Sequence, residues 1–366
     1  MLNIPSVDIN LRPEFLALLA STGVEADSLI TLDDLPKQES RTEKLQPENT
    51  QWILVDHNAL QGALGSQYTG RVNGVIDHHD EEHKVPHDTQ NEPRIIEKAG
   101  SCTSLVTNYC SAAWDLISSQ ALSTGGAVAQ DDARGLINDQ AYLSTWDAQI
   151  AKVALASILI DTSNLRSKDK VTKHDIEATA YLEAKIVASP QISKDFNRNT
   201  FYQEIAQAKV NIGHLSIHDI LRKDYKQWNE GSKALGVSSV VKNIDFLMDK
   251  AKSEDYGEEA SQAFLQAVDT FAKDRELDMY AVMTTSTSAE GHFQRELYLS
   301  AVKADTIKSA SKFEQESTAE LGLSEWHGSS QVNFANENCW RKVWQQHELQ
   351  HSRKRVAPLL RQSLSA

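Results

Sequence analysis

The sequence predicts an α/β fold: a domain built on a parallel sheet, followed by a smaller α+β domain. Three short apolar runs in the first half each end in an aspartate, namely WILVD (52–56), GVID (74–77) and SILID (157–161). Aliphatic runs without alternation are typical of strands buried on both faces of a parallel sheet. Helical patterns lie between and after these runs, and this alternation predicts right-handed crossover connections.

Three helices are expected in the first domain. One begins near Ser101, a second includes residues 141–155, and a third follows Thr172. Thr172 and Asp175 have the spacing of a capping box, which marks the start of that third helix. Two segments that are polar or rich in Gly, Ala and Ser are expected to be surface loops: 36–50 and 119–133.

The pattern breaks at SPQIS (189–193), which predicts a linker between domains at 1–190 and 196–366. The second domain is expected to contain, in order, helices near 201–213 and 216–228, a strand near 237–241, a helix over 258–271, and a hairpin made by MYAVMTT (279–285) and RELYLSAV (295–302). The final stretch, 340–361, is basic, with six Lys or Arg residues and the single acid Glu348.

Composition limits the classes of function. With 366 residues, 40% of them apolar, the chain can bury the cores of two domains. Its formal net charge of -14 argues against a general nucleic-acid surface, and its three cysteines show no paired spacing of a disulfide framework. The N-terminus has no signal-peptide pattern, and no stretch approaches the roughly 20 apolar residues that span a bilayer. We therefore expect a cytoplasmic protein without a membrane segment.

The acids at the ends of the predicted strands form the candidate site. Ligands of open α/β sheets bind beyond the carboxyl ends of the strands, so Asp56, Asp77 and Asp161 are expected to meet at one crevice. Histidines follow two of these acids, in the runs Asp56-His57-Asn58 and Asp77-His78-His79-Asp80. Carboxylates combined with imidazoles suit Mn²⁺ or a similar divalent ion, and two such ions about 3.5–4 Å apart can clamp a phosphoryl group.

Each of these features has an ordinary structural explanation. An aspartate after a strand is more often a helix cap or turn residue, and a His-His pair is more often a surface or packed pair. The occurrence of all three together favours the metal site. His57 either orients a neighbour or binds metal, whereas His83 and His87 are interpreted as solvated loop residues.

A resemblance to a known family follows from four motifs in order: VDHN (55–58), IDHH (76–79), GSCTSLV (100–106) and ILIDT (158–162). They resemble the successive motifs of the DHH phosphoesterase superfamily, in particular fungal exopolyphosphatases and the related prune and family II inorganic pyrophosphatases. The second domain resembles the C-terminal DHH-associated domain of that branch. RKDYK (222–226) and SRKRVAP (352–358) resemble its substrate-binding elements.

The resemblance implies a role for each site residue. Asp56 would bridge two metal ions, and His78 and Asp161 would complete the ligands of one of them. Asp77 would support the metal ligands without binding the metal itself. His79 would face the phosphate or the leaving group, so Asp56 and His79 are the catalytic candidates. Mn²⁺ is the expected ion, with Mg²⁺ or Co²⁺ as alternatives. The residues expected to hold phosphates, in a cleft between the domains, are Arg222, Lys223, Ser352, Arg353 and Lys354.

One motif of the family has no counterpart. The family begins with a strand that ends in an acidic motif and supplies further metal ligands, but none of the early aspartates follows a buried-strand run; they are Asp8, Asp27, Asp33 and Asp34. We therefore expect the first βα unit to be missing, which would also expose the edge of the neighbouring strand. With fewer ligands for the metals, hydrolysis by this chain is expected to be weak or absent.

The leading hypothesis is a monomeric, metal-dependent exopolyphosphatase that removes terminal phosphate from linear polyphosphate. Two alternatives stay open: the same chemistry on pyrophosphate or a nucleotide polyphosphate, and a catalytically degenerate paralogue that binds polyphosphate and serves in regulation. The acidic surface and the type of C-terminal domain argue against a nucleic-acid phosphodiesterase.

Overall fold

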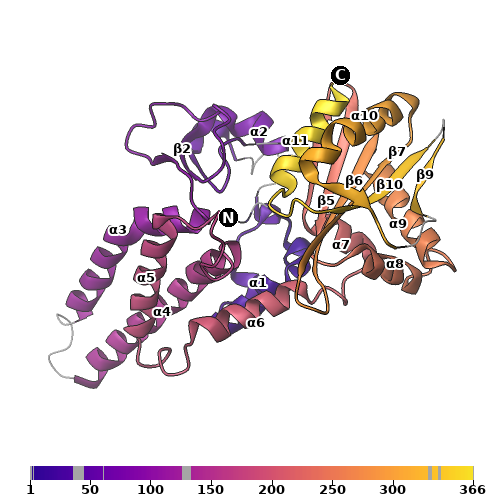
Figure 1. Cartoon of the computed structure of the whole chain (residues 1–366). Helices are drawn as coiled ribbons and strands as arrows, with labels where there is room; N and C mark the ends of the chain where they lie inside the picture. Colours follow the sequence, from indigo (N-terminus) through magenta and orange to yellow (C-terminus); the bar gives the residue numbers. More distant parts are fainter. Residues whose placement is uncertain are drawn as a thin grey trace. The chain divides into compact units, whose positions relative to one another are not determined.

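The computed structural model describes residues 2, 4–35, 45–60, 62–125, 133–328, 332–336 and 339–365. The chain divides into two compact units (Figure 1). The first contains Met1–Ile9 and Glu14–Ala208, and the second contains Asn10–Pro13 and Lys209–Ala366. Each unit has its own sheet and hydrophobic core, which confirms the predicted order of a parallel-sheet domain followed by an α+β domain.

The sheet of the first unit consists of three parallel strands in the order β1-β2-β3, and these are β1 (Trp52–Val55), β2 (Val72–Asp77) and β3 (Arg94–Ile96). The runs at 52–56 and 74–77 are therefore strands, as expected. Only β2 is buried on both faces, because Ile53 and Val55 of β1 are 45% and 47% exposed.

The expectation of a strand at 157–161 is wrong, because this run is the last part of helix α4 (Ala133–Asp161). Ala151, Leu155, Ile158 and Leu159 recur at helical spacing and are all fully buried in the core. A run of only three aliphatic residues, such as 158–160, fits a buried strand and a buried helix equally, and here the helical spacing of the buried residues distinguishes them. The third strand is β3, whose three residues are too few to be recognised as an apolar run.

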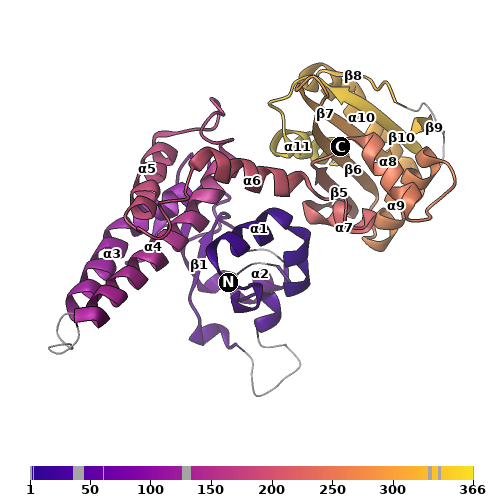
Figure 2. The same ribbon diagram turned by 90° about the horizontal axis from the view of Figure 1, so that it is seen from below.

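Four long helices complete the first unit: α3 (Cys102–Gly125), α4, α5 (Lys173–Val187) and α6 (Arg198–Val210). In both views α3, α4 and α5 lie side by side (Figures 1 and 2). The capping box of Thr172 and Asp175 is present at the start of α5. The shorter elements are η1 (Ser6–Leu11), α1 (Pro13–Thr22), η2 (Ala26–Ser28), η3 (Leu32–Asp34), η4 (Pro47–Asn49), α2 (Gly62–Tyr68) and η5 (Thr69–Arg71).

One expectation about loops is corrected within this unit. Residues 119–125 belong to α3 rather than to a loop, while 126–132 and 36–44 lie outside the described residues. The first unit also continues beyond the expected linker at 189–193. Phe201 and Ile205 of α6 pack into the same core as α4 and α5, so the first unit extends to Ala208.

One described segment, Leu143–Asp161 in α4, has the length and mean hydropathy of a membrane span, which differs from the expectation of no such stretch. Core helices of globular proteins pass the same test. The buried side chains of this segment, among them Leu155, Ile158 and Leu159, belong to the core of the first unit.

The second unit is built on a seven-stranded mixed sheet in the order β4-β5-β6-β7-β10-β8, with β9 paired to β10. Its strands are β4 (Tyr225–Glu230), β5 (Lys233–Val240), β6 (Met279–Thr287), β7 (Phe293–Ala301), β8 (Leu323–Glu325), β9 (Phe334–Ala335) and β10 (Trp340–Gln346). The hairpin of β6 and β7 is confirmed. The predicted helix at 216–228 is wrong in its second half, because the chain leaves the helix after Lys223 and pairs as β4 with β5.

Helices cover both faces of this sheet. One core contains side chains of α7 (Ile217–Lys223), α8 (Ile244–Ser253) and α9 (Ala260–Asp274). The other contains side chains of α10 (Ala304–Leu321) and α11 (Arg353–Leu364). The start of α11 and the end of α7, which carry the basic residues singled out in the sequence, therefore belong to one unit.

We expect Leu155→Ala to lower the free energy of unfolding of the first unit by about 2–5 kcal/mol, because the side chain is fully buried and its removal leaves a cavity. The matched control is Ile150→Ala on the same helix, where the side chain is 50% exposed. That change should cost less than about 0.5 kcal/mol. Urea unfolding followed by circular dichroism measures both, and equal losses would contradict the packing of α4.

Candidate functional site

Asp56 stands at the point where β1 ends. Its backbone N–H donates to the carbonyl of Ile76 at 3.1 Å, which continues the pairing of β1 with β2 by one residue. Its φ of 65° then turns the chain out of the sheet, a left-handed conformation that aspartate tolerates better than most residues. The side chain is 64% exposed, so its carboxylate is accessible to a ligand.

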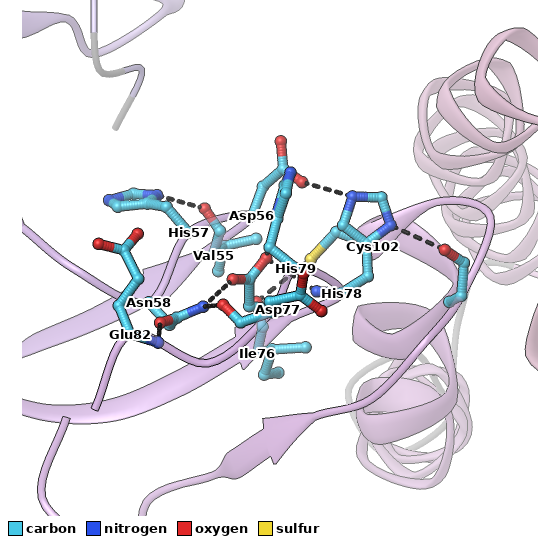
Figure 3. A network of polar contacts seen from close by, with 12 residues as sticks. Val55, Asp56, His57, Asn58, Ile76, Asp77, His78, His79, Glu82 and Cys102 are labelled. Atoms are coloured by element: carbon cyan, nitrogen blue, oxygen red, sulfur yellow. Dashed lines mark hydrogen bonds and ion pairs between the residues drawn. The ribbon is translucent and has the colours of Figure 1, made fainter. Parts of the chain in front are cut away.

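His78 and His79 follow the end of β2 and approach Asp56 (Figure 3). Nδ1 of His78 lies 2.9 Å from the carbonyl oxygen of Ala99, and Nε2 lies 3.3 Å from Oδ1 of Asp56. Nδ1 of His79 lies 2.7 Å from Oδ1 of Asp77. Because the carbonyl and the carboxylate can only accept, Nδ1 of each ring is the donor, and Nε2 of the neutral ring carries the lone pair that binds a metal.

Asp77 is the fully buried centre of this network. Its Oδ1 accepts from His79 and from the backbone N–H of His78, and its Oδ2 accepts from Nδ2 of Asn58 at 2.6 Å. Burial by itself raises the pKa of Asp77, but the hydrogen bonds from His79 and Asn58 outweigh it and hold that pKa far below its usual value. Asp77 is therefore an anion that orients His79.

Two groups of side chains in the described part of the chain could hold a metal ion, and Asp56 belongs to both. One consists of Asp56, His78 and His79, and the other of Asp56, Asp77 and Cys102, with the ligand atoms of each group within 4.8 Å of one another. Burial and the nearby charge of Asp56 raise the pKa of Cys102 to about 12, so its thiol keeps its proton and donates to the carbonyl of Ile76. Because Sγ of Cys102 is engaged with that carbonyl and Asp77 already accepts three hydrogen bonds, the group with two imidazoles is the better candidate.

Asp161 belongs to neither of these two groups, although the sequence suggested it as a ligand together with Asp56 and His78. It is the exposed last residue of α4, and its Oδ2 accepts a hydrogen bond from Oγ of Ser101 at 2.7 Å. Ser101 directly precedes Cys102, so this bond places Asp161 beside the start of α3.

Sequence reasoning gave no role to two buried residues at the site. Asn58 donates to Asp77 and to the carbonyl of Asp80, and its Oδ1 accepts from the N–H of Glu82. Its position directly after Asp56-His57 was the available signal. Asp175 was recognised only as part of a capping box, but its carboxylate also accepts from the backbone N–H groups of Gly100 and Ser101. These bonds occupy the backbone N–H groups that precede α3.

The other histidines behave differently from one another. Nδ1 of His57 lies 2.9 Å from the carbonyl of Val55 and therefore donates to it, and His57 is in neither metal-binding group. His83 is 76% exposed and lies 3.6 Å from Glu81, in agreement with its interpretation as a solvated loop residue.

The predicted phosphate-binding residues gather in the second unit around Asp224. Arg353 donates through Nη1 to the carbonyl of Asp224 and through Nη2 to its carboxylate, at 2.8 and 2.7 Å. Arg222 and Lys223, at the end of α7, immediately precede Asp224, and Nε of Arg222 donates to Asp219. Ser352 is the N-cap of α11 and accepts from the N–H of Lys354, whose side chain is exposed.

The depressed pKa of Asp77 predicts a pH dependence of stability. A carboxyl whose pKa is lower in the folded state stabilises the protein above its unfolded pKa, and this contribution is lost as the pH falls. Wild type should exceed Asp77→Asn in free energy of unfolding at neutral pH, and the difference should shrink below about pH 4. Urea titrations of both proteins at several pH values measure it; a difference that grows with acid would contradict the network.

Comparisons with known proteins agree with this architecture. A family model described as the DHHA2 domain matches residues 203–363. The chain is 28% identical over 363 residues to a Schizosaccharomyces pombe protein named "Putative exopolyphosphatase", covering 99% of this chain and 81% of that protein. A "Methanococcus jannaschii putative family II inorganic pyrophosphatase" of known crystal structure shares the fold, with a TM-score of 0.54 at 19% identity, over 97% of this chain and 88% of that chain.

The chain therefore contains a DHHA2 domain over residues 203–363, is similar to a protein named as an exopolyphosphatase over nearly its full length, and shares the fold of a family II inorganic pyrophosphatase.

Proposed function

We propose that this chain is a metal-dependent hydrolase of phosphoanhydride bonds that releases terminal phosphate from linear polyphosphate. The observation that carries the proposal is the convergence of ligand atoms of Asp56, His78 and His79 within 4.8 Å at the ends of two parallel strands. The named function of the Schizosaccharomyces pombe relative supports the substrate class.

The donor set fits a divalent transition metal. Asp56 offers an accessible carboxylate, and His78 is held with Nδ1 on a backbone carbonyl so that Nε2 faces Asp56. Mixed nitrogen and oxygen ligands of this kind suit Mn²⁺, with Mg²⁺ and Co²⁺ as alternatives. When bound, such an ion lowers the pKa of water and polarises a phosphoryl oxygen. We assign Asp56 and His78 as ligands, and His79, the third member of this group, to proton transfer instead of metal binding.

His79 is assigned to proton transfer at the exposed side of the site. The carboxylate of Asp77 accepts from Nδ1 of His79 and so orients the ring, which leaves Nε2 as the nitrogen that takes up or gives away a second proton. Nε2 of His79 can then donate a proton to the oxygen of the leaving phosphate, whose charge would otherwise grow as the phosphoanhydride bond breaks. The buried Asn58 keeps Asp77 in place through this step.

Basic residues of the second unit would bind the phosphate chain. Arg353 is held by Asp224, yet a guanidinium has five N–H donors, so it can still donate to phosphate. Cationic side chains are required here because the chain as a whole carries a net charge of -14 and repels polyphosphate. We assign this role to Arg222, Lys223, Ser352, Arg353 and Lys354.

Asp56→Ala should reduce Mn²⁺-stimulated phosphate release from short polyphosphate to the metal-free background, because the carboxylate shared by both ligand groups is removed. Asp27→Ala, which removes an exposed acid of the same unit, is the matched control and should retain wild-type rates. Release is followed by a colorimetric phosphate assay with and without Mn²⁺. Activity that survives Asp56→Ala refutes the assignment.

Arg353→Ala should raise KM for polyphosphate about tenfold or more while changing kcat little, because it removes charge-assisted hydrogen bonds to bound phosphate. The control is Arg361→Ala on the same helix, where the side chain pairs with Glu230 instead. Steady-state kinetics at several polyphosphate concentrations separate the two constants. An equal rise in KM for both variants would point to general charge loss.

The same assay tests the alternatives. Release from pyrophosphate that exceeds release from longer chains would favour a pyrophosphatase, and preference for nucleotide polyphosphates would favour a nucleotide phosphatase. Polyphosphate binding in calorimetry without any phosphate release would favour a regulatory paralogue. Weak turnover, as expected from the ligand set, should still require Mn²⁺ and Asp56.

A further inference from the structure

Asp175 is a fully buried carboxylate that belongs to neither metal-binding group. It accepts five hydrogen bonds from two segments of the chain, residues 100–104 and Thr172. Oδ1 accepts from the N–H of Ser101 at 3.1 Å and from Oγ of Ser104 at 2.7 Å. Oδ2 accepts from the N–H of Gly100 at 2.9 Å, and from the N–H and Oγ1 of Thr172 at 2.7 and 2.8 Å.

The backbone at Gly100 packs closely against Thr162 and Asp175. A Cβ at this position would lie 2.6 Å from Cγ2 of Thr162 and 3.0 Å from Oδ2 of Asp175, so only glycine fits. Thr162 directly follows Asp161. The turn that Asp175 holds is therefore packed against the end of α4, where Asp161 stands.

Two hydrogen bonds connect residues 101 and 102 to Asp161 and to strand β2. Oγ of Ser101 donates to Oδ2 of Asp161 at 2.7 Å, and Sγ of Cys102 donates to the carbonyl of Ile76 at 3.2 Å. The same carbonyl of Ile76 accepts from the N–H of Asp56. Residues 100–102 thus contact Asp161 directly, and they contact β2 at the carbonyl of Ile76 that also binds the N–H of Asp56.

We propose that Asp175 is a positioning residue of the metal centre. Its carboxylate fixes the backbone conformation of Gly100 and Ser101. Ser101, through its hydrogen bond to Asp161, then orients the carboxylate of Asp161 toward the ion bound by Asp56 and His78. The inference rests on the proposed metal-dependent function. It adds to that function the residue that orients Asp161, an acid that stands at the end of a helix and not of a strand.

The chemistry requires a carboxylate at position 175. Backbone N–H groups point at both oxygens, from Ser101 at Oδ1 and from Gly100 and Thr172 at Oδ2. Asparagine has one accepting oxygen and one donating NH₂ group. In either orientation its NH₂ meets a backbone donor that cannot rotate away, so one side of the turn loses its partner.

The experiment compares Asp175→Asn with Thr172→Ala. Thr172→Ala removes one hydroxyl donor and weakens the α5 cap but leaves the bonds to Gly100 and Ser101 intact. Two quantities are measured: hydrogen exchange of a peptide covering 98–105 in metal-free protein, with the β6 peptide 279–287 as a reference for global unfolding, and the Kd for Mn²⁺ by calorimetry.

We expect Asp175→Asn to speed exchange in 98–105 but not in β6, and to raise the Kd for Mn²⁺ about tenfold or more, the usual effect of losing a residue that orients a ligand. Thr172→Ala should change neither. Ser101→Ala should raise the Kd similarly, and the double variant should add little further, because both changes act through the same bond to Asp161.

A wild-type Kd in Ser101→Ala overturns the proposal whether or not Asp175→Asn folds, and so does a wild-type Kd in Asp175→Asn. Equal effects of Thr172→Ala and Asp175→Asn on the Kd would mean that Asp175 acts only by capping α5, and this result would also overturn the proposal. If exchange rises in Asp175→Asn while the wild-type chain binds no Mn²⁺, the lock on the turn stands and the proposed metal-dependent function fails instead.

Discussion

The candidate site depends on one buried anion, the carboxylate of Asp77. A charge withdrawn from water is tolerated only when hydrogen bonds replace its hydration, and here an amide, a backbone N–H and an imidazole do so. Because the carboxylate must stay ionised, it dictates the tautomer of His79 and fixes Asn58. The exposed residues of the site are ordered by this charge, which itself has no contact with solvent.

The parallel sheet explains why the ligands converge. Strands β1 and β2 run in the same direction, so Asp56 and His78 leave the sheet at the same edge although they lie far apart in sequence. Asp161 stands at the end of helix α4 and not at the end of a strand. Its placement therefore depends on side-chain hydrogen bonds and on the close packing at Gly100, which are local constraints that the sheet does not impose.

The parts of the site that follow a strand could be predicted from the sequence, because VDHN and IDHH combine a buried run with polar residues at its end. Asp161 was assigned to a strand because ILID satisfies both periodicities over four residues. The bonds from Asp175 to Gly100 and Ser101 join positions 75 and 74 residues apart, and no local pattern encodes such a pairing. The strand β3 was missed because three residues show no period.

The bond between Arg353 and Asp224 has a consequence for binding. An arginine on a surface normally samples many rotamers, and a ligand that captures it must restrict them. Here the guanidinium is already held by a backbone carbonyl and a carboxylate of one residue, and the side chain is only 17% exposed. An incoming anion would meet a cation whose rotamer is set in advance, so little conformational entropy is lost at that position when the complex forms.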